Sequence, residues 1–263
     1  FTFNVMPASR MRFRGLERIT ILQRDAKKNG VRSMARIRSM TGNDFKNAVE
    51  SYAWCWALCR FLDSHPTTQT DFRKLARSFM TTPPRESFEA FFSGITGTLE
   101  TEWALFATSI EHRYNFQDHV IIFQAGHPLK DDLHLTEVDS SKSWQSTLVQ
   151  VEAGRACTVA ATGFFDLQAS STDVPGNTSE SPRWISEANG ISIHYHKGQP
   201  LGRLLGAIHA EGQQHSMLQT IPLGNNASFT PTQSGTLYLR INDRPDSLAD
   251  NRGLLSVSIR SSE

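Results

Sequence analysis

Residues 237–260, "LYLRINDRPDSLADNRGLLSVSIR", allow the architecture of the second half of this chain to be argued from pattern alone. Apolar residues alternate with polar ones on both sides of a central loop, at Leu237, Leu239, Ile241, Leu255, Val257 and Ile259. Alternation with a period of two is typical of strands that bury one face. The stretch therefore predicts two strands joined by a loop that is crowded with carboxylate and amide oxygens.

That loop has the composition of a site for a hard cation. Asp243, Asp250 and Asn251 could all point inward, and Gly253 would let the chain rejoin its strand. Calcium takes roughly six to eight oxygen ligands from carboxylates, amides and backbone carbonyls. The spacing differs from that of an EF-hand, which needs acidic residues at alternate positions and a closing Glu. Because Asp, Asn, Pro and Gly are also ordinary turn formers, a plain hairpin loop is the alternative.

Outward from this loop, the whole second half repeats the strand pattern. After Trp144, short alternating runs separated by turn residues indicate an all-β sandwich. Residues 166–183 interrupt the strands with one long polar loop. We predict that residues 143–263 form the sandwich and that the polar, Ser-rich residues 136–142 are a linker.

The first half has helical periodicity instead. Apolar and aromatic residues follow i, i+3, i+4 spacing from about Asn43 to Tyr114, and Asn43 or Asp44 can cap the first of these helices. The aromatic side chains are expected to form a core. The predicted fold class is thus α+β and multidomain, with a helical subdomain at residues 1–135 followed by the all-β sandwich.

Composition limits the partners that this chain can have. Of 263 residues, 38% are hydrophobic and 20% charged, as in a soluble globular protein. Residues 1–80 hold 15 of the 27 Lys and Arg residues but 6 of the 26 Asp and Glu residues. Since these Arg residues alternate with Met, Ile and Leu, as on a solvated helix face, nucleic acid is not a predicted partner. No stretch is long and apolar enough for a transmembrane segment.

The cysteines and the start of the chain carry further expectations. Cys55, Cys59 and Cys157 do not make a disulfide framework, and the first two are expected to be small core residues. The chain shows no signal peptide and begins with Phe1 rather than Met. We therefore expect it to be the C-terminal piece of a longer protein.

Three segments of the second half resemble one lectin family. "LRINDRPDSLADNRGLLSVSI" resembles the calcium-binding loop of PA-I-type galactophilic lectins, which reads N-D-x-P, a spacer, an acid or amide, Asn, x and Gly. "VEAGRACTVAATGFFDL" is similar to the early strand pair of that family, and "GQPLGRLLGAI" to a later strand. Together they cover most of residues 143–260. The resemblance implies a galactose-binding-like, PA-I lectin-like sandwich with calcium as its cofactor.

The resemblance also implies a ligand set. Asp243, Asp250 and Asn251 would be side-chain ligands of calcium, and Ser247 and Leu167 would supply backbone carbonyls. In that family the metal itself coordinates sugar hydroxyls, so a carbohydrate or a cell-envelope glycan is the implied partner.

The sugar-contacting part of the family pattern is different here. The lectins have a His-Pro-x-Gln stretch that contacts the sugar, whereas this chain has Glu187, Ala188 and Asn189 at that place, and Leu167 stands where the family has Tyr. Galactose specificity is therefore not implied. Trp184 is the candidate for stacking on a sugar face, with core or rim packing as the alternative, and Asn189 is the second ligand-binding candidate.

The helical half resembles the C-terminal helices of bacterial peptidase-MA-like, gluzincin-type domains. The likeness covers about residues 40–115 and is carried by Tyr52-Ala53, Trp56-Ala57-Leu58, Leu99-Glu100 and Glu102-Trp103. Such proteins bind zinc through H-E-x-x-H, whose Glu is the general base. That motif is absent here, so zinc is expected only in missing upstream sequence, and this chain alone is not expected to be an enzyme.

Two functions from different classes follow. The first is a fragment of a metallopeptidase-like protein whose calcium-dependent carbohydrate-binding module targets the parent protein to glycan. The alternative is a non-catalytic structural or protein-interaction sandwich with no sugar ligand. Both resemblances imply a bacterial protein that is secreted or periplasmic.

Overall fold

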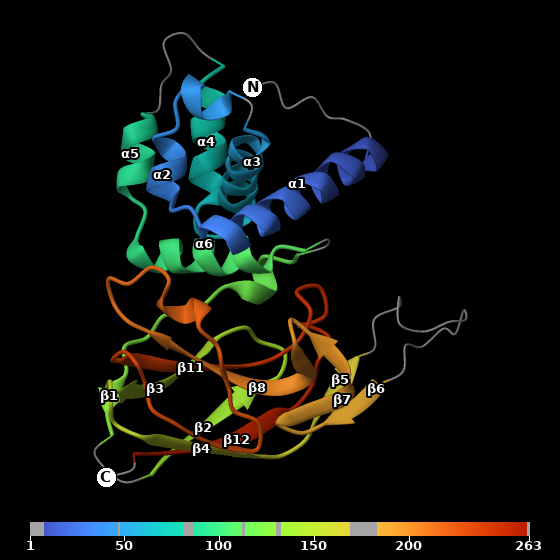
Figure 1. Cartoon of the computed structure of the whole chain (residues 1–263), viewed down its shortest axis with the longest axis vertical. Coiled ribbons are helices and arrows are strands. Elements are labelled where there is room, and N and C mark those ends of the chain that lie inside the picture. Colours follow the sequence, from blue (N-terminus) through green and yellow to red (C-terminus); the bar gives the residue numbers. More distant parts are fainter. Residues whose placement is uncertain are drawn as a thin grey trace. The chain divides into compact units, whose positions relative to one another are not determined.

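The computed structural model describes residues 8–46, 48–80, 87–111, 114–129, 133–168 and 183–261 (Figure 1). The chain divides into two compact units, Phe1–Phe116 and Gln117–Glu263. The first is built of helices and the second of strands, which confirms the predicted α+β class with helices preceding the β region.

The helical unit contains six α-helices and one short 3-10 helix within its described residues. They are α1 (Ala8–Asn29), α2 (Met34–Arg38), η1 (Gly42–Phe45), α3 (Val49–Ser64), α4 (Gln69–Ser78), α5 (Phe88–Ser93) and α6 (Gly97–Ser109).

The predicted cap of the main helix is wrong. Asn43 and Asp44 lie in η1, and α3 begins only at Val49. The Asp44 carboxylate instead accepts a hydrogen bond of 2.7 Å from the Thr41 backbone N–H, which closes a capping box on η1. The acidic residue thus caps the short helix that contains it, and the longer helix starts four residues after the end of η1.

The aromatic side chains of the helical unit form its core, as predicted. Trp54 and Trp103 are fully buried and meet edge to face, with ring centroids 6.0 Å apart. The indole N–H of Trp54 donates to the buried Asp25 carboxylate at 2.6 Å, and Arg32 pairs with the same carboxylate at 3.0 Å. This core therefore holds one buried charge that is satisfied by several donors.

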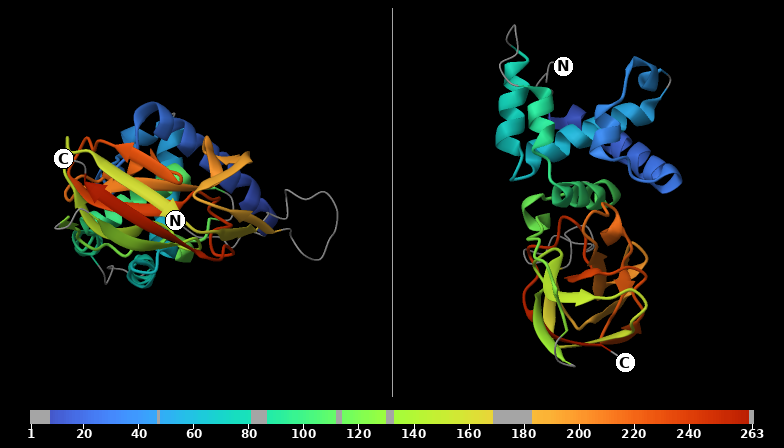
Figure 2. Two further views of the ribbon diagram at one scale, coloured as in Figure 1. Left: turned by 90° about the horizontal axis from the view of Figure 1, so that it is seen from below. Right: turned by 90° about the vertical axis from the view of Figure 1, so that its left-hand side faces the viewer.

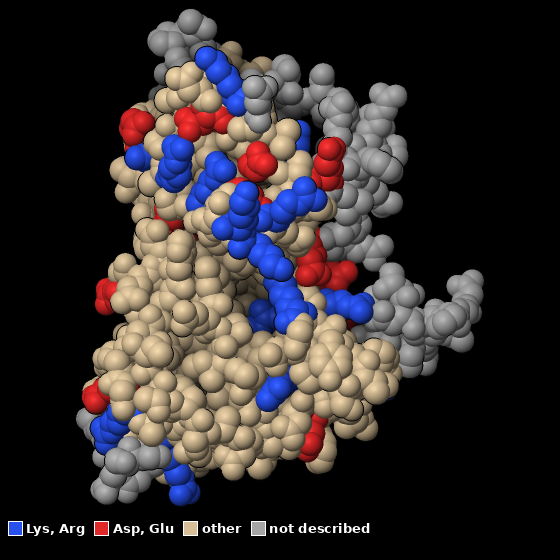
Figure 3. All heavy atoms as spheres, viewed as in Figure 1, with Lys and Arg blue, Asp and Glu red and all other residues tan. Residues whose placement is uncertain are grey.

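Basic side chains gather over the helices on the face shown in Figure 3. Within the helical unit several basic side chains form ion pairs, among them Arg36 with Asp44 and Arg73 with Asp63. Arg18 lies over the ring of Trp56 at 5.9 Å. Part of the basic excess of residues 1–80 is thus used in contacts inside the helical unit.

The second unit is a two-layered sandwich with an additional two-stranded sheet. Its strands are β1 (His127–Pro128), β2 (His134–Asp139), β3 (Gln145–Val151), β4 (Cys157–Thr162), β5 (Phe165–Gln168), β6 (Arg183–Ser186), β7 (Asn189–His196), β8 (Gln199–His209), β9 (Ile221–Pro222), β10 (Asn226–Phe229), β11 (Gly235–Ile241) and β12 (Leu254–Ser261).

The two larger sheets enclose one apolar core (Figure 2). The six-stranded sheet has the order β1-β3-β11-β8-β7, with β9 beside β8, and the four-stranded sheet has the order β10-β4-β12-β2. Inward side chains of both sheets, such as Leu204, Leu237, Val159 and Leu255, belong to the same buried cluster. Strands β5 and β6 form a separate antiparallel pair.

The boundary between the units differs from the predicted linker at residues 136–142. The units divide between Phe116 and Gln117, and most of the predicted linker belongs to β2, which pairs with β12. Only Val138 is fully buried on this strand, and Leu135 is 70% exposed. A strand that buries so few residues at the edge of a sheet has a polar sequence, which explains why it resembles a linker.

Candidate metal centre

The oxygen-rich loop connects the two sheets of the sandwich. Strand β11 ends at Ile241 in the six-stranded sheet, and β12 begins at Leu254 in the four-stranded sheet. The loop is therefore not a plain hairpin loop, which was the alternative to a cation site. Gly253, which was expected to let the chain rejoin its strand, has φ +122°, a conformation that favours glycine.

Asn242 fixes the start of this loop. Its side-chain amide donates to the backbone carbonyls of His196, Gln199 and Pro200, at 3.2, 3.0 and 2.9 Å. Its backbone also pairs with β8. The Asn242 N–H donates to the backbone carbonyl of Arg203, and the Asn242 carbonyl accepts from the backbone N–H of Gly202, both at 2.8 Å. The loop thus leaves the sheet from a position that the β7–β8 turn holds in place.

Two of the predicted ligands meet inside the loop. The Asn251 amide nitrogen donates to Asp243 Oδ2 at 2.9 Å and to the Ser140 carbonyl at 3.2 Å. Asp243 is 5% exposed and Asn251 is 2% exposed. The amide oxygen of Asn251 is buried without a hydrogen-bond partner, although buried polar atoms are ordinarily satisfied. An oxygen without a donor, next to a buried carboxylate, fits a cation.

The electrostatics of the two carboxylates point the same way. Burial raises the pKa of Asp243 to about 7, against the opposing effect of its hydrogen bonds from Asn251 and the Arg244 N–H. Burial, followed by the charge of Asp246, raises the pKa of Asp250 to about 6. Both carboxylates are therefore destabilised as anions, and a bound divalent ion would offset this cost.

The remaining two predicted ligands are placed less directly. Ser247 is buried in the loop, and its N–H donates to the Arg244 carbonyl at 3.1 Å. Leu167 lies on β5, where the preceding residue, Asp166, exchanges backbone hydrogen bonds with Arg252 at 2.7 and 3.0 Å. Successive residues of a strand direct their backbone groups to opposite sides, so those of Leu167 face β6. The Leu167 carbonyl is thus the ligand that this geometry supports least.

The two predicted sugar-contacting residues lie on neighbouring strands. Trp184 on β6 is partly buried against the core and stacks on His194, with ring centroids 4.3 Å apart and an interplanar angle of 15°. Asn189 at the start of β7 is exposed, and its side-chain oxygen accepts a hydrogen bond from the Asn225 N–H at 2.9 Å. Strand pairing sets Trp184 directly opposite Leu167.

Some residues of the site were missed by sequence reasoning. Ser140, whose carbonyl holds Asn251, comes from the segment after β2 that was predicted to be a linker. Asn242 was recognised only as part of the N-D pattern, without its anchoring role. No sequence signal identifies Ser140, because its backbone carbonyl would be the same in any residue.

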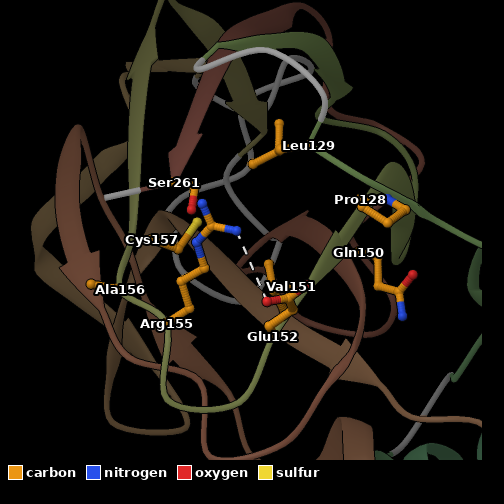
Figure 4. A pocket seen from close by; sticks show the side chains of 9 residues that line it. All are labelled: Pro128, Leu129, Gln150, Val151, Glu152, Arg155, Ala156, Cys157 and Ser261. Carbon is orange, nitrogen blue, oxygen red and sulfur yellow. Dashed lines mark ion pairs between the residues drawn. The ribbon is translucent and has the colours of Figure 1, made fainter. Parts of the chain in front are cut away.

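A small pocket lies at the other end of β12, away from the loop (Figure 4). Cys157 lines it, and burial raises the pKa of this thiol to about 11. Glu152 and Arg155, also in its wall, form an exposed ion pair at 3.9 Å. A protonated thiol is a weak nucleophile, so this arrangement gives no basis for covalent catalysis.

In the described part of the chain, no group of three or more His, Cys, Asp or Glu side chains is placed to hold a metal ion. The candidate centre has two carboxylates and depends on amide and carbonyl oxygens for its other ligands, which suits calcium better than zinc.

None of the described helices is long and apolar enough to cross a membrane.

No protein-family model matches the sequence, and no curated protein matches it either. Among solved structures, the chain is similar to the N-terminal domain of EclA, a PllA-like lectin, with 20% identity, a TM-score of 0.35 and coverage of 50% of this chain and 98% of that domain. It is also similar to PliG of Aeromonas hydrophila, a periplasmic inhibitor of g-type lysozyme, with 10% identity, a TM-score of 0.27 and coverage of 55% and 96%. At these identities and TM-scores, neither likeness decides a function.

Proposed function

We propose that the sandwich is a calcium-dependent carbohydrate-binding module. The observation that carries the proposal is the buried, unpartnered amide oxygen of Asn251 beside Asp243, a carboxylate whose pKa is raised to about 7. Asp243, Asp250 and Asn251 would be side-chain ligands, with Ser247 and Leu167 as carbonyl ligands. Calcium at such a site stabilises the loop and offers further coordination positions to hydroxyl groups.

Exposure of one ligand supports a role in binding as well as in structure. Asp250 is exposed, whereas Asp243 and Asn251 are buried. An ion held between them would thus be anchored from inside the sandwich and reachable from solvent near Asp250. Vicinal hydroxyls of a sugar could then replace water on the metal, with Trp184 and Asn189 as contacts at the side of the β5–β6 pair.

A module of this kind would hold its parent protein on a glycan and raise the local concentration of substrate. A secreted or periplasmic location suits it, because extracellular calcium modules work at roughly 0.1–1 mM calcium.

The resemblance of the helical unit to peptidase-MA-like domains is a prediction from sequence, and so is zinc in upstream sequence. In the described part of this unit, His65 Nε2 lies 3.2 Å from Glu102 Oε2.

The experiment is a glycan array probed with the full chain in calcium and in EDTA. Wild type, Asp250→Asn and the control Glu152→Gln are compared, since Glu152 is an exposed carboxylate at the opposite end of the sandwich. We expect wild type to bind glycan in calcium and not in EDTA. Asp250→Asn should weaken this binding at least about tenfold, and the control Glu152→Gln should bind as wild type does. Glycan binding that is unaffected by EDTA would contradict the proposal.

The alternative is a structural module in which calcium, if bound, only ties the two sheets together. The connection of β11 and β12 across the sheets favours it, because an ion there would staple the layers. Calcium binding and calcium-dependent melting without binding to any glycan on the array would select this alternative.

A further inference from the structure

Two exposed arginines are neighbours of one aspartate beside the candidate metal centre. Asp166 on β5 lies directly opposite Arg252 at the end of the loop, with which it exchanges two backbone hydrogen bonds. Arg183 on β6 places its Nε 3.7 Å from Asp166 Oδ2. The two arginines therefore come from different segments and both neighbour Asp166, Arg183 through its side chain and Arg252 as the cross-strand partner of Asp166.

These side chains share the solvent-facing side of the strands. Phe165 and Leu167, the neighbours of Asp166 on β5, are buried in the core. Side chains alternate along a strand, so Asp166 points outward, as does its cross-strand partner Ile185, which is 74% exposed. Arg252 is exposed as well. A ligand can thus reach both arginines from solvent.

The same arginines adjoin the proposed calcium ligands. Arg252 follows Asn251 directly in sequence. Asp250, an exposed ligand candidate, stands two positions before Arg252 in the same loop. Arg183 is brought to this loop by its ion pair with Asp166, the cross-strand partner of Arg252.

Bound calcium would neutralise the charge of Asp250 and leave Asp166 as the carboxylate beside the two arginines. An exposed ion pair at 3.7 Å is weak and is readily exchanged for a better acceptor. A planar guanidinium binds a carboxylate of matching geometry through two parallel hydrogen bonds.

We infer that the ligand of this module is an acidic sugar, a uronic acid type of residue. Its ring hydroxyls bind calcium and its carboxylate is held by Arg183 and Arg252. The inference rests on the proposed calcium-dependent carbohydrate binding and adds the chemical class of sugar to it.

The test compares two sugars that differ mainly at one position. The methyl glycosides of D-galacturonic acid and D-galactose share their ring hydroxyls, but the first has a carboxylate where the second has a hydroxymethyl group. Each is titrated into the full chain in saturating calcium, for wild type, Arg183→Gln, Arg252→Gln and the control Arg260→Gln. Arg260 is exposed at the far end of β12. Calcium binding by each variant is measured separately.

We expect wild type to bind the uronic acid at least about tenfold more tightly than the neutral sugar, since a charge-assisted hydrogen bond is worth more than a neutral one. Arg183→Gln and Arg252→Gln should remove most of this preference and keep calcium binding, and Arg260→Gln should change neither. Equal calcium-dependent affinity for both sugars would overturn the inference and leave the proposed function standing. Absence of calcium binding in wild type would overturn both.

Discussion

At the scale of single residues, the candidate centre depends on a carboxylate that is costly to bury. Asp243 is 5% exposed and is held by the Arg244 N–H at 2.7 Å and the Asn251 amide at 2.9 Å. These two hydrogen bonds do not compensate for burial, since the pKa is raised to about 7. Folding without a metal therefore favours the protonated form of Asp243.

The first prediction concerns the pH dependence of the calcium-free protein. The folded pKa of Asp243 is about 7, against an ordinary value of 3.8, so its stabilising contribution is present below about pH 4 and is lost as the pH rises toward 7. Asp243→Asn removes this dependence. Urea unfolding in EDTA checks this. Between pH 4 and 7, the free energy of unfolding of wild type should fall relative to that of the variant, by on the order of a few kcal/mol.

The comparison with the variant is needed because three histidines act in the opposite direction. Burial lowers the pKa of His119 to about 4, that of His196 to about 3 and that of His209 as well, so each favours folding less as the pH falls below about 6.5. Their effect is common to both proteins and cancels in the difference. A difference that stays constant from pH 4 to 7 would show that the Asp243 carboxylate is not buried as described.

The second prediction concerns Asn242. Its amide shares two hydrogens among three carbonyls, and replacement by alanine leaves these acceptors without that donor. Asn242→Ala should lower the free energy of unfolding of the sandwich by about 2–3 kcal/mol. It should also weaken calcium binding, because the loop loses its attachment to the β7–β8 turn. Chemical denaturation and calcium titration check the two effects, and an unchanged midpoint would contradict the anchoring role.

At the scale of elements, the sequence predicted the helical region and the strand region but not how the strands are shared between sheets. The alternation in residues 237–260 predicted β11 and β12 with little error. It could not show that they belong to opposite sheets, because alternation reports a buried face and not a partner. Strand β2 was missed for the converse reason, since an edge strand that buries little carries little pattern.

For the candidate ligands as well, the sequence predicted the side chains but not the backbone groups around them. Asp243 and Asn251 could be chosen from sequence because their side chains carry the chemistry, and the structure brings them within 2.9 Å. The carbonyl of Leu167 could not be judged in this way, because its direction depends on which neighbour β5 pairs with. Backbone ligands are a property of the fold more than of the residue type.

The third prediction uses the glycine that closes the loop. Gly253 has φ +122°, and an added Cβ would lie 3.0 Å from the Phe164 carbonyl oxygen. Gly253→Ala should therefore destabilise the sandwich by about 1–3 kcal/mol and weaken calcium binding. Gly212→Ala is the matched control, since Gly212 also has positive φ, +78°, but open space around it. Thermal melts of both variants with and without calcium check this, and equal effects would contradict a crowded loop end.

At the scale of the whole molecule, the two units have separate cores. Trp54 and Trp103 are buried in the helical unit, whereas the sandwich buries aliphatic side chains from two sheets. The proposed ligands all belong to the second unit. A ligand that binds only the folded form stabilises the cooperative unit that contains its site.

The fourth prediction follows from this division. Hydrogen–deuterium exchange in saturating calcium should slow at residues 237–260 and in β5, and should not change in α3 and α6. Trp54→Phe removes the donor to Asp25 and should destabilise the helical unit without changing calcium affinity. Protection that rises equally in both units would contradict a site confined to the sandwich.

The most direct test of the central claim is calcium titration calorimetry on the full chain, with wild type and Asp243→Asn side by side. The account predicts saturable binding of one ion per chain to wild type and loss of that binding in the variant, which should still fold in EDTA. Absence of saturable binding to wild type at millimolar calcium, or equal binding by both proteins, would contradict a calcium site in the loop at residues 242–253.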